Sequence, residues 1–375
     1  QVNIYNAGMS EEDLCEAIKD VSILGIRSKT QVTEKVLRHG KRLLAIGAFC
    51  IGTNQIDIKS AQKRGIVVFN APFSNTRSVV ELVIAEIILL MRNLVDKIPK
   101  MHQGEWNKSA RNSFEVRGKI LGIIGYGSIG SQLSVVAESL GMKVIYFDLV
   151  EKLGLGNVIP CESMENLITQ SDIISVHVDG RKENNHLIGK SQFDLMKPGV
   201  IFLNLSRGSV VNNIDLKNAI QSGKVAGAGV DVFPQEPMSN KDVFLSELRG
   251  LPNTILTPHI GGSTLEAQKN IANFVPTRII DYINTGSTSN TVGFPDITLP
   301  MLKQAHRFIH IHMNSAGVLA KINSILARRK LNIVGQYLKT NEDIGYVITD
   351  INKKYDKKVI KELKEIDETI RFRVL

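Results

Sequence analysis

The chain has 375 residues, of which 43% are hydrophobic and 22% are charged, and its formal net charge is +9. This length allows two or three domains with cores of their own, and the composition excludes a disordered or a membrane-spanning polypeptide. The positive charge is compatible with a solvated surface, an anionic small substrate or nucleic acid. Because the basic residues are spread along the chain, we expect no nucleic-acid partner.

The cysteines and the longest apolar segment indicate in which cellular compartment the protein is expected and whether it spans a membrane. Cys15, Cys50 and Cys161 show no CxxC spacing, which favours a reducing compartment, expected to be the cytoplasm, and predicts no metal site. The most apolar helix candidate, residues 79–91, is interrupted by Glu81 and Glu86 and is too short to span a bilayer. We therefore expect no membrane association.

The first part of the chain alternates short strands with helices, which predicts a parallel sheet covered by helices. A long apolar helix after Pro72 then connects to the next domain. The predicted strands cover residues 21–25, 43–46 and 67–70, and the predicted helices cover 11–19, 33–39, 56–64 and 76–97.

A glycine-rich turn follows the apolar run 120–124 and has the spacing Gly125-x-Gly127-x-x-Gly130. A helical pattern comes next, then a strand that ends on Asp148. In this arrangement the glycines allow a tight turn, a close approach to a pyrophosphate and helix packing, while the acidic residue accepts from ribose hydroxyls. A plain glycine-rich turn is the alternative, but the surrounding strand, helix, strand and acid favour NAD binding.

The alternation of strands and helices continues to about residue 258 and predicts a doubly wound sheet of six strands. These strands cover residues 120–124, 144–147, 173–176, 200–205, 226–230 and 254–256. A helix is predicted over 264–283, and residues 284–300, rich in Gly, Ser, Thr and Pro, are typical of a linker. The remaining segment reads β-α-β-β-α-β, which predicts a ferredoxin-like unit.

Three residues after late strands of the doubly wound domain could oxidise a 2-hydroxy acid. Arg207 could fork onto a carboxylate, His259 could accept the hydroxyl proton, and Glu236 could raise the proton affinity of that imidazole. Taken singly, each has an ordinary reading: a salt-bridged arginine, a loop carboxylate or a structural histidine. Together, after a complete dinucleotide-binding pattern, they favour catalysis.

Several sequence segments resemble those of the D-3-phosphoglycerate dehydrogenases, a branch of the D-2-hydroxyacid dehydrogenases. The resemblance is to the bacterial form of these enzymes, which carries one C-terminal ACT domain. The segments are residues 46–55, 69–78, 122–127, 206–208, 231–234 and 256–264. The resemblance implies NAD-dependent oxidation of 3-phosphoglycerate to 3-phosphohydroxypyruvate, the first step of L-serine synthesis, and the capacity to reduce 2-oxoglutarate. It also implies a homotetramer, and relatives have roughly one more βα unit before the point where this chain starts.

The resemblance implies three domains. A discontinuous, flavodoxin-like substrate domain would take residues 1–75 and 264–298, a Rossmann NAD-binding domain 76–263, and a ferredoxin-like ACT domain 305–375. It assigns catalysis to Arg207, Glu236 and His259, with His259 as the proton donor or acceptor. The residues expected to touch NAD are Gly125, Gly127, Ser128, Ile129, Gly130, Asp148, Leu205, Ser206, Arg207, Asp231, His259, Ile260, Gly261 and Gly262.

The resemblance also suggests two further sites. Arg27, Lys29 and Lys108 would bind the substrate phosphate, with Lys29 standing where relatives have Arg. Trp106 would anchor a dimer, the alternative being an ordinary core aromatic.

L-serine, as feedback inhibitor, would bind His312, Asn314 and Asn332. Ala316 stands before Gly317, where relatives commonly have Pro, which predicts a less preorganised loop and weaker inhibition.

Two other functions share this pattern. A sister D-2-hydroxyacid dehydrogenase acting on lactate, glycerate or glyoxylate is disfavoured by Arg27, Lys29 and the C-terminal unit. A non-catalytic NAD-sensing protein, like the corepressors of this fold, could retain the same three residues, but the ACT-like unit speaks against it.

Overall fold

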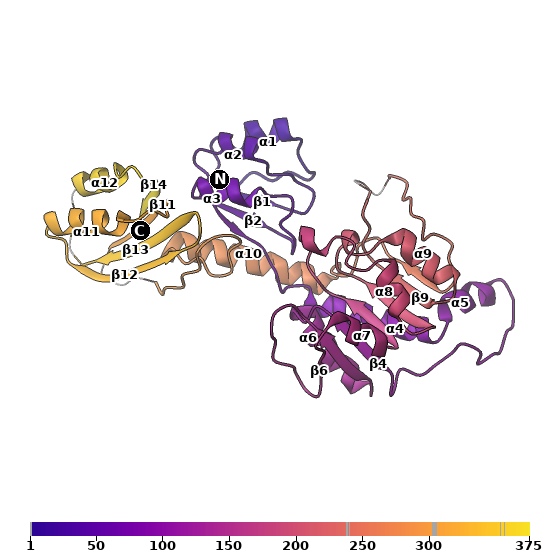
Figure 1. Cartoon of the computed structure of the whole chain (residues 1–375). Coiled ribbons are helices and arrows are strands. Elements are labelled where there is room, and N and C mark those ends of the chain that lie inside the picture. The colour runs from indigo at the N-terminus through magenta and orange to yellow at the C-terminus, as the bar shows by residue number, and fades with distance from the viewer. Residues whose placement is uncertain (1, 238, 240, 302–305, 353, 356) are drawn as a thin grey trace. The chain divides into compact units, whose positions relative to one another are not determined.

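The computed structural model describes residues 2–237, 239, 241–301, 306–352, 354–355 and 357–375 (Figure 1). The chain divides into two compact units, one formed by Gln1–Ser74 with Lys269–Leu375 and the other by Asn75–Gln268. Residue 305, at which the predicted C-terminal domain starts, lies outside the described residues. Within those residues, no helix is long and apolar enough to cross a membrane.

The unit formed by Asn75–Gln268 is built on a seven-stranded parallel sheet in the order β10-β9-β8-β7-β4-β5-β6. All six predicted strands are present, and the short β6 extends one edge. Because β4 lies in the middle and later strands add on both sides, the chain reverses direction beside β4, as in a doubly wound sheet. The strands are β4 (Ile120–Ile124), β5 (Lys143–Phe147), β6 (Ile159–Pro160), β7 (Ile173–Val176), β8 (Val200–Asn204), β9 (Val225–Val230) and β10 (Thr254–Leu256).

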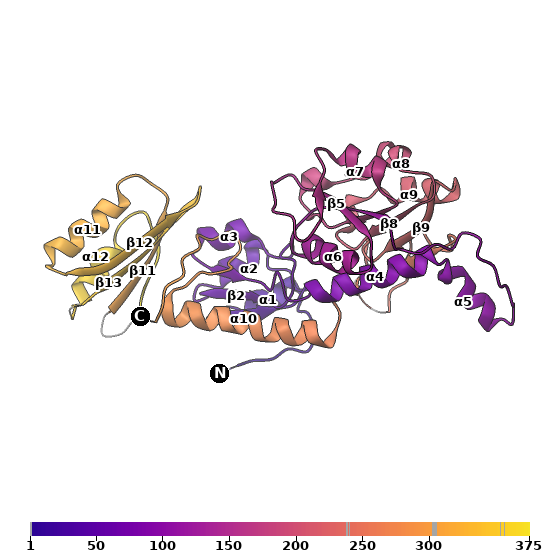
Figure 2. The same ribbon diagram turned by 90° about the horizontal axis from the view of Figure 1, so that it is seen from below.

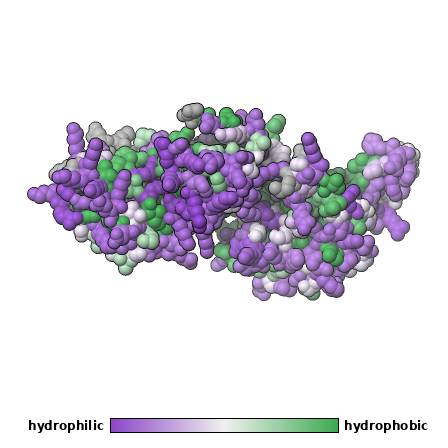
Figure 3. Space-filling view, turned by 90° about the horizontal axis from the view of Figure 1, so that it is seen from above, coloured by the Kyte–Doolittle hydropathy of each residue, from purple (hydrophilic) through white to green (hydrophobic). Residues whose placement is uncertain are grey.

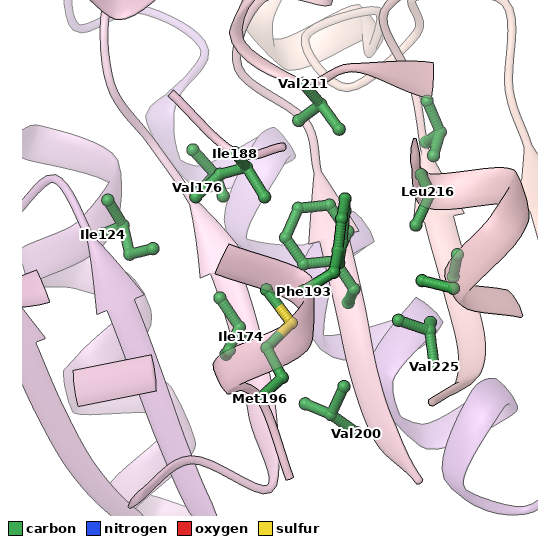
Figure 4. Packing of buried hydrophobic residues seen from close by; sticks show 14 of the residues in the cluster. Ile124, Ile174, Val176, Ile188, Phe193, Met196, Val200, Val211, Leu216 and Val225 are labelled. Atoms are coloured by element: carbon green, nitrogen blue, oxygen red, sulfur yellow. The ribbon is translucent and has the colours of Figure 1, made fainter. Parts of the chain in front are cut away.

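Helices cover both faces of this sheet (Figure 2). On one face α4 (Thr76–Met91) and α6 (Ser128–Ser139) contribute Val83, Ile87 and Leu133 to one buried cluster. On the other, α7 (Met164–Gln170), α8 (Lys190–Leu195) and α9 (Asn213–Gln221) contribute to a second cluster, which also contains Met196 just after α8. In that cluster the ring of Phe193 lies against the strands (Figure 4). Apolar residues on both faces of the strands explain their continuous hydrophobic runs.

The predicted single helix over residues 76–97 is wrong. Helix α4 ends at Met91, and a separate helix, α5 (Leu94–His102), begins after Asn93. Asn93 has φ 52°, a left-handed conformation that asparagine tolerates better than most residues and that stops an α-helix. The apolar pattern alone did not reveal this break, because residues on both sides of it have helical propensity.

Glu86 is a buried carboxylic acid on α4. It is 1% exposed, and neither of its carboxyl oxygens has a hydrogen-bond partner among the described residues. Burial, followed by the negative charge of Asp231, raises the pKa of Glu86 to about 8. The folded protein therefore holds a proton on Glu86 at neutral pH that the unfolded chain releases.

We expect this proton to make the unfolding free energy fall as pH rises from about 5 to about 8, because the unfolded chain then binds fewer protons than the folded one. The Glu86→Gln variant should lack this component and should be more stable than the wild type at pH 9, by about 1–3 kcal/mol. Denaturant unfolding at pH 6 and pH 9 measures it, with Glu81→Gln, an exposed position on the same helix, as the control. Parallel stability curves for wild type and Glu86→Gln would contradict the prediction.

The other unit begins with a three-stranded parallel sheet, ordered β1-β2-β3 and formed by β1 (Ile23–Ile26), β2 (Ala45–Ala48) and β3 (Val67–Phe69). One face packs against α1 (Glu11–Ala17), α2 (Glu34–His39) and α3 (Ile58–Lys63) through a buried cluster. The other face packs against α10 (Leu265–Thr285), whose Val275 and Ile279 approach Gly47 closely. A helix from late in the sequence thus covers the second face of the N-terminal sheet.

The C-terminal segment forms a four-stranded antiparallel sheet in the order β12-β13-β11-β14, with α11 (Val318–Arg328) and α12 (Lys357–Lys364) on one face. This arrangement confirms the predicted ferredoxin-like fold. The opposite face shares a buried cluster with α10 and β3, through residues such as Ile309 and Tyr346. The strands are β11 (His306–Met313), β12 (Ile333–Thr340), β13 (Ile344–Ile351) and β14 (Thr369–Val374).

Residues 284–300 do not behave as the loose linker that their composition suggests. Thr288 is fully buried, and its hydroxyl donates to the Pro295 carbonyl at 2.6 Å and accepts from the Ile297 N–H at 2.9 Å. The Tyr346 hydroxyl of β13 donates to the Gly286 carbonyl at 2.6 Å. Small polar residues are used here to satisfy buried backbone groups, so the segment joins α10 to the C-terminal sheet rigidly.

Candidate active site

The glycine-rich turn lies between β4 and the N-terminus of α6. Gly130 is held so close to the Gly125 carbonyl that a Cβ would come within 2.4 Å of its oxygen, which explains the requirement for glycine. The N-cap residue Gly127 provides no side-chain hydrogen bond to the helix, so the first N–H groups of α6, including those of Ser128 and Ile129, are not capped by that residue. Such a helix N-terminus suits a pyrophosphate.

Asp148 lies at the end of β5 beside this turn. Its carboxylate accepts from the Tyr126 N–H at 2.8 Å and from the Val150 N–H at 3.0 Å. These two bonds fix the orientation of the carboxylate, and an ionised carboxylate has further lone pairs to accept from ribose hydroxyls. The predicted acid is therefore held against the glycine-rich turn.

Arg207 follows β8 in a loop shaped by a buried amide. The Asn204 side chain accepts from the Ser206 hydroxyl at 2.7 Å and donates to the Arg207 carbonyl at 3.1 Å. Gly208 brings this loop against the next one, because a Cβ there would meet the Phe233 carbonyl carbon at 2.0 Å. Asn204 was not singled out from the sequence, although a polar residue ending a buried strand is a detectable signal.

His259 and Glu236 are in direct contact, after β10 and β9 respectively. The His259 Nδ1 lies 2.8 Å from Glu236 Oε2 and 3.0 Å from Oε1. Glu236 also accepts from the Phe233 N–H at 3.2 Å, which ties the carboxylate to its own loop. The structure therefore brings together two of the three predicted catalytic residues, leaving Nε2 of the imidazole as the ring nitrogen that can face a substrate.

The pair shifts both proton affinities. The hydrogen bond that His259 donates to Glu236 is the main cause that raises the pKa of His259, and burial opposes it. Burial by itself would raise the pKa of Glu236, but the hydrogen bond and the charge of His259 hold that pKa below its usual value. Arg207 is near enough to lower both pKa values by its positive charge. The three predicted residues thus share one electrostatic environment.

The loop that carries His259 is organised by Asp231, which is 2% exposed. The Asp231 carboxylate accepts from the Thr257 hydroxyl at 2.6 Å and from the N–H groups of Ile260 and Gly261, both at 2.8 Å. These bonds support the left-handed backbone of His259, whose φ is 55°. Thr257 was missed from the sequence, because only the fold shows which carboxylate its hydroxyl reaches.

The remaining predicted NAD contacts lie around these loops. Leu205 and Ser206 are buried, at 6% exposure each, whereas Ile260 is 42% exposed. Asn75 lies so close to Gly262 that a Cβ there would meet the Asn75 side-chain nitrogen at 2.2 Å. The expected cofactor-binding residues therefore follow the carboxyl ends of β4, β5, β8, β9 and β10, the edge at which doubly wound sheets bind ligands.

The candidate phosphate-binding residues belong to exposed segments. Arg27 and Lys29 follow β1, and Lys108 lies beyond α5 in the other unit. Trp106 is 78% exposed, so the alternative that it is a core aromatic of this chain is wrong.

The three residues suggested for serine do not meet within one chain. His312 ends β11 opposite Gly345, which in turn pairs with Thr340 at the far end of β12. Asn332 precedes Ile333, which pairs with Ile351 at the opposite end of the sheet. The seven residue-to-residue steps from Ile333 to Thr340 correspond to roughly 23 Å. His312 and Asn314 are close in the chain, and Asn332 can join such a pair only from a second copy.

A glycine-rich turn at a helix N-terminus, together with a base and a guanidinium after later strands of the same sheet, is the arrangement of a dinucleotide-dependent dehydrogenase. Comparison with known proteins makes this class more specific. The family model for the D-isomer specific 2-hydroxyacid dehydrogenase NAD-binding domain matches residues 84–261, and an AHAS small subunit-like ACT domain model matches residues 308–371.

Named relatives match along the whole chain. The D-3-phosphoglycerate dehydrogenase of Haemophilus influenzae is 48% identical over 374 residues, covering 100% of this chain and 91% of the relative. That of Dictyostelium discoideum is 49% identical over 375 residues, with 100% and 92% coverage. The chain therefore belongs to the D-3-phosphoglycerate dehydrogenase family, whose nucleotide domain binds NAD.

Solved structures share the fold of the dehydrogenase part. D-2-hydroxyisocaproate dehydrogenase matches with a TM-score of 0.70 and 26% identity, covering 77% of this chain and 91% of that one. D-lactate dehydrogenase from Aquifex aeolicus, complexed with NAD and lactic acid, matches with a TM-score of 0.65 and 28% identity, covering 72% and 85%.

Proposed function

We propose that this enzyme catalyses the NAD-dependent oxidation of 3-phosphoglycerate to 3-phosphohydroxypyruvate, the first step of L-serine biosynthesis. The observation that carries the proposal is the His259–Glu236 hydrogen bond at 2.8 Å, at the cofactor edge of a doubly wound sheet. Relatives that bear this enzyme's name match over the full chain and support the choice of substrate.

Bound at this site, NAD would supply the acceptor for the hydride that leaves C2 of the substrate. His259 accepts the hydroxyl proton at Nε2 and becomes an imidazolium, which Glu236 stabilises from the Nδ1 side. Arg207 binds the substrate carboxylate and polarises the oxygen that becomes a carbonyl. Asp231 contributes by holding the loop of His259, while Asp148 and the first N–H groups of α6 would hold the ribose and the pyrophosphate of the cofactor.

The pH dependence follows from the same pair. Oxidation requires a neutral imidazole, so kcat/KM should rise with pH through the pKa of His259, which Glu236 raises. The Glu236→Gln variant removes that cause, so we expect its acid limb to lie at lower pH than that of the wild type and its maximal rate to be lower. Initial rates between pH 5.5 and pH 10 measure this. An acid limb that stays in place would remove Glu236 from control of this proton.

The substrate phosphate is proposed to bind Arg27, Lys29 and Lys108, because guanidinium and ammonium groups both pair with a phosphate dianion. The test of the proposed function is NADH formation with 3-phosphoglycerate compared with D-glycerate, which lacks only the phosphate. We expect kcat/KM to be at least about 10²-fold higher for the phosphorylated acid, since the analogue forgoes the contacts that the phosphate makes with these cations. Equal values would favour another D-2-hydroxyacid dehydrogenase, and no turnover of either acid would favour an NAD-sensing protein.

We further propose that L-serine inhibits the enzyme by binding His312 and Asn314 of one copy with Asn332 of another, in a homotetramer located in the cytoplasm. The register of β11, β12 and β13 supports sharing between copies, because it separates Asn332 from the other two residues in one chain. The enzyme is also proposed to reduce 2-oxoglutarate. If saturating L-serine leaves the turnover unchanged, the regulatory proposal fails and the catalytic one is unaffected.

A further inference from the structure

A cavity of about 430 Å³ lies between the helices of the N-terminal sheet and strand β14 of the ferredoxin-like domain, within one compact unit. Five cationic side chains line it: Arg38, Lys41, Lys63, Arg64 and Arg371. Its one acidic lining residue, Glu368, is held by Lys321 at 2.6 Å. Figure 3 shows one face of the protein, on which hydrophilic residues predominate, so exposed charge alone does not distinguish the cavity. Its distinguishing feature is that carboxylates of the described residues balance few of these cations.

The cations of this cavity are poorly compensated. Arg38 is paired with Glu34 at 2.7 Å, but the same carboxylate is 3.9 Å from Arg64. The Arg64 Nε is buried and has no hydrogen-bond partner in the described part of the chain. Neither Lys41 nor Lys63 forms an ion pair with a described residue. Most of the positive charge is therefore unbalanced by protein carboxylates.

Arg371 is the least expected of the five, because it is partly buried and has no acidic partner among the described residues. Its guanidinium donates to the Leu43 carbonyl, at the turn after α2. Burial lowers the pKa of Arg371; Tyr282 opposes this effect and the neighbouring Arg373 adds to it. A desolvated cation next to another cation is costly unless an anion joins it.

An ordinary explanation accounts for only some of these residues. Arg38 and Lys63 lie in the last turns of α2 and α3, where cations complement the helix carbonyls. Lys41 lies after α2 and Arg371 in β14, so helix ends do not explain them. The cavity is also within the size range of small-molecule sites, and forked guanidiniums with lysines are the usual partners of phosphate.

We propose that this cavity is a binding site for a phosphate group, taken up as inorganic phosphate or as part of a small phosphorylated acid. The site is separate from the candidate active site, and the proposal does not depend on the proposed reaction. Bound phosphate would bridge Lys41 and Lys63 of the substrate domain to Arg371 of the ferredoxin-like domain. The ligand would stabilise the contact between these domains, because the complete binding site exists only when the two domains are in contact.

The experiment measures binding of inorganic phosphate to the full-length protein by calorimetry at constant ionic strength in chloride. An Arg27→Gln background weakens the phosphate site proposed for the substrate, so that the cavity is measured by itself. The test variant is Lys41→Gln/Lys63→Gln, in which both residues are exposed. Its control is Lys59→Gln/Lys339→Gln, which removes the same charge from two other exposed lysines that form no ion pair with a described residue.

We expect saturable binding of one phosphate per chain, weakened at least about tenfold in the test variant and changed less than about twofold in the control. Phosphate should also raise the unfolding temperature of the control more than that of the test variant. Tighter binding of 3-phosphoglycerate than of inorganic phosphate would identify the phosphorylated acid as the source, and the reverse would identify free phosphate. Unchanged binding in the test variant, equal binding of unphosphorylated glycerate, or no saturable binding would overturn the proposal.

Discussion

Replacing His259 by Gln should lower kcat for 3-phosphoglycerate oxidation by about 10²–10⁴-fold, with a much smaller change in KM, because the variant loses the group that we propose accepts the hydroxyl proton. Gln retains a polar side chain of similar length, so the loop held by Asp231 should keep its bonds to Thr257, Ile260 and Gly261. Initial rates of NADH formation at saturating substrate and cofactor measure the effect.

The control for this prediction is His39→Gln, an exposed histidine at the end of α2 whose ring hydrogen-bonds the Lys35 carbonyl of the same helix. Its kcat should remain within about twofold of the wild type, as is usual for a surface change. If His259→Gln also stays within that range, the proton is taken by another group and the mechanism proposed for this pair is wrong.

The largest effect on stability should come from Arg307. Its guanidinium forms a bidentate ion pair with Asp350, at 2.7 and 2.8 Å, with both side chains less than a tenth exposed. It also donates to the carbonyls of Thr285 at 2.7 Å and Pro300 at 3.1 Å. One side chain therefore connects β11 and β13 to the segment after α10.

The Arg307→Met variant should lose about 3–5 kcal/mol of unfolding free energy, because it leaves the Asp350 carboxylate buried without a partner. The double variant Arg307→Met/Asp350→Leu should recover much of that loss, since no charge then remains buried. Denaturant unfolding followed by far-UV circular dichroism compares the three proteins. A single variant less than about 1 kcal/mol below the wild type would show that the buried pair contributes no more than a surface ion pair.

The effects expected for His259 and Arg307 arise from different parts of the fold. His259 and Glu236 act through a contact between two loops that depends on β9 and β10 being neighbours, and Arg307 acts through the packing of the C-terminal sheet on residues 284–300. The cationic cavity depends on that same packing, since β14 contributes Arg371 to it. Loss of Arg307 should therefore also weaken phosphate binding in the cavity.

The sequence by itself determined the features that are local in the chain. Apolar runs of three to six residues separated by helical patterns predicted all six strands of the dinucleotide-binding sheet. The spacing of Gly125, Gly127 and Gly130 predicted the turn, in which Gly125 has φ 94° and a Cβ on Gly130 would collide with the Gly125 carbonyl. The order of elements predicted the ferredoxin-like unit for the same reason.

The tertiary structure decided what depends on residues far apart in the chain. Composition made residues 284–300 resemble a linker, yet their hydroxyls satisfy buried backbone groups that only the packed fold creates. The apolar pattern through Asn93 continued a helix that the left-handed backbone of this residue ends. The positions of Asp231 beneath the His259 loop, of Asn332 at the far end of β12 and of Arg371 beside Lys41 follow from strand order and register. Short sequence patterns do not encode these relations, because they arise when separate elements pack together.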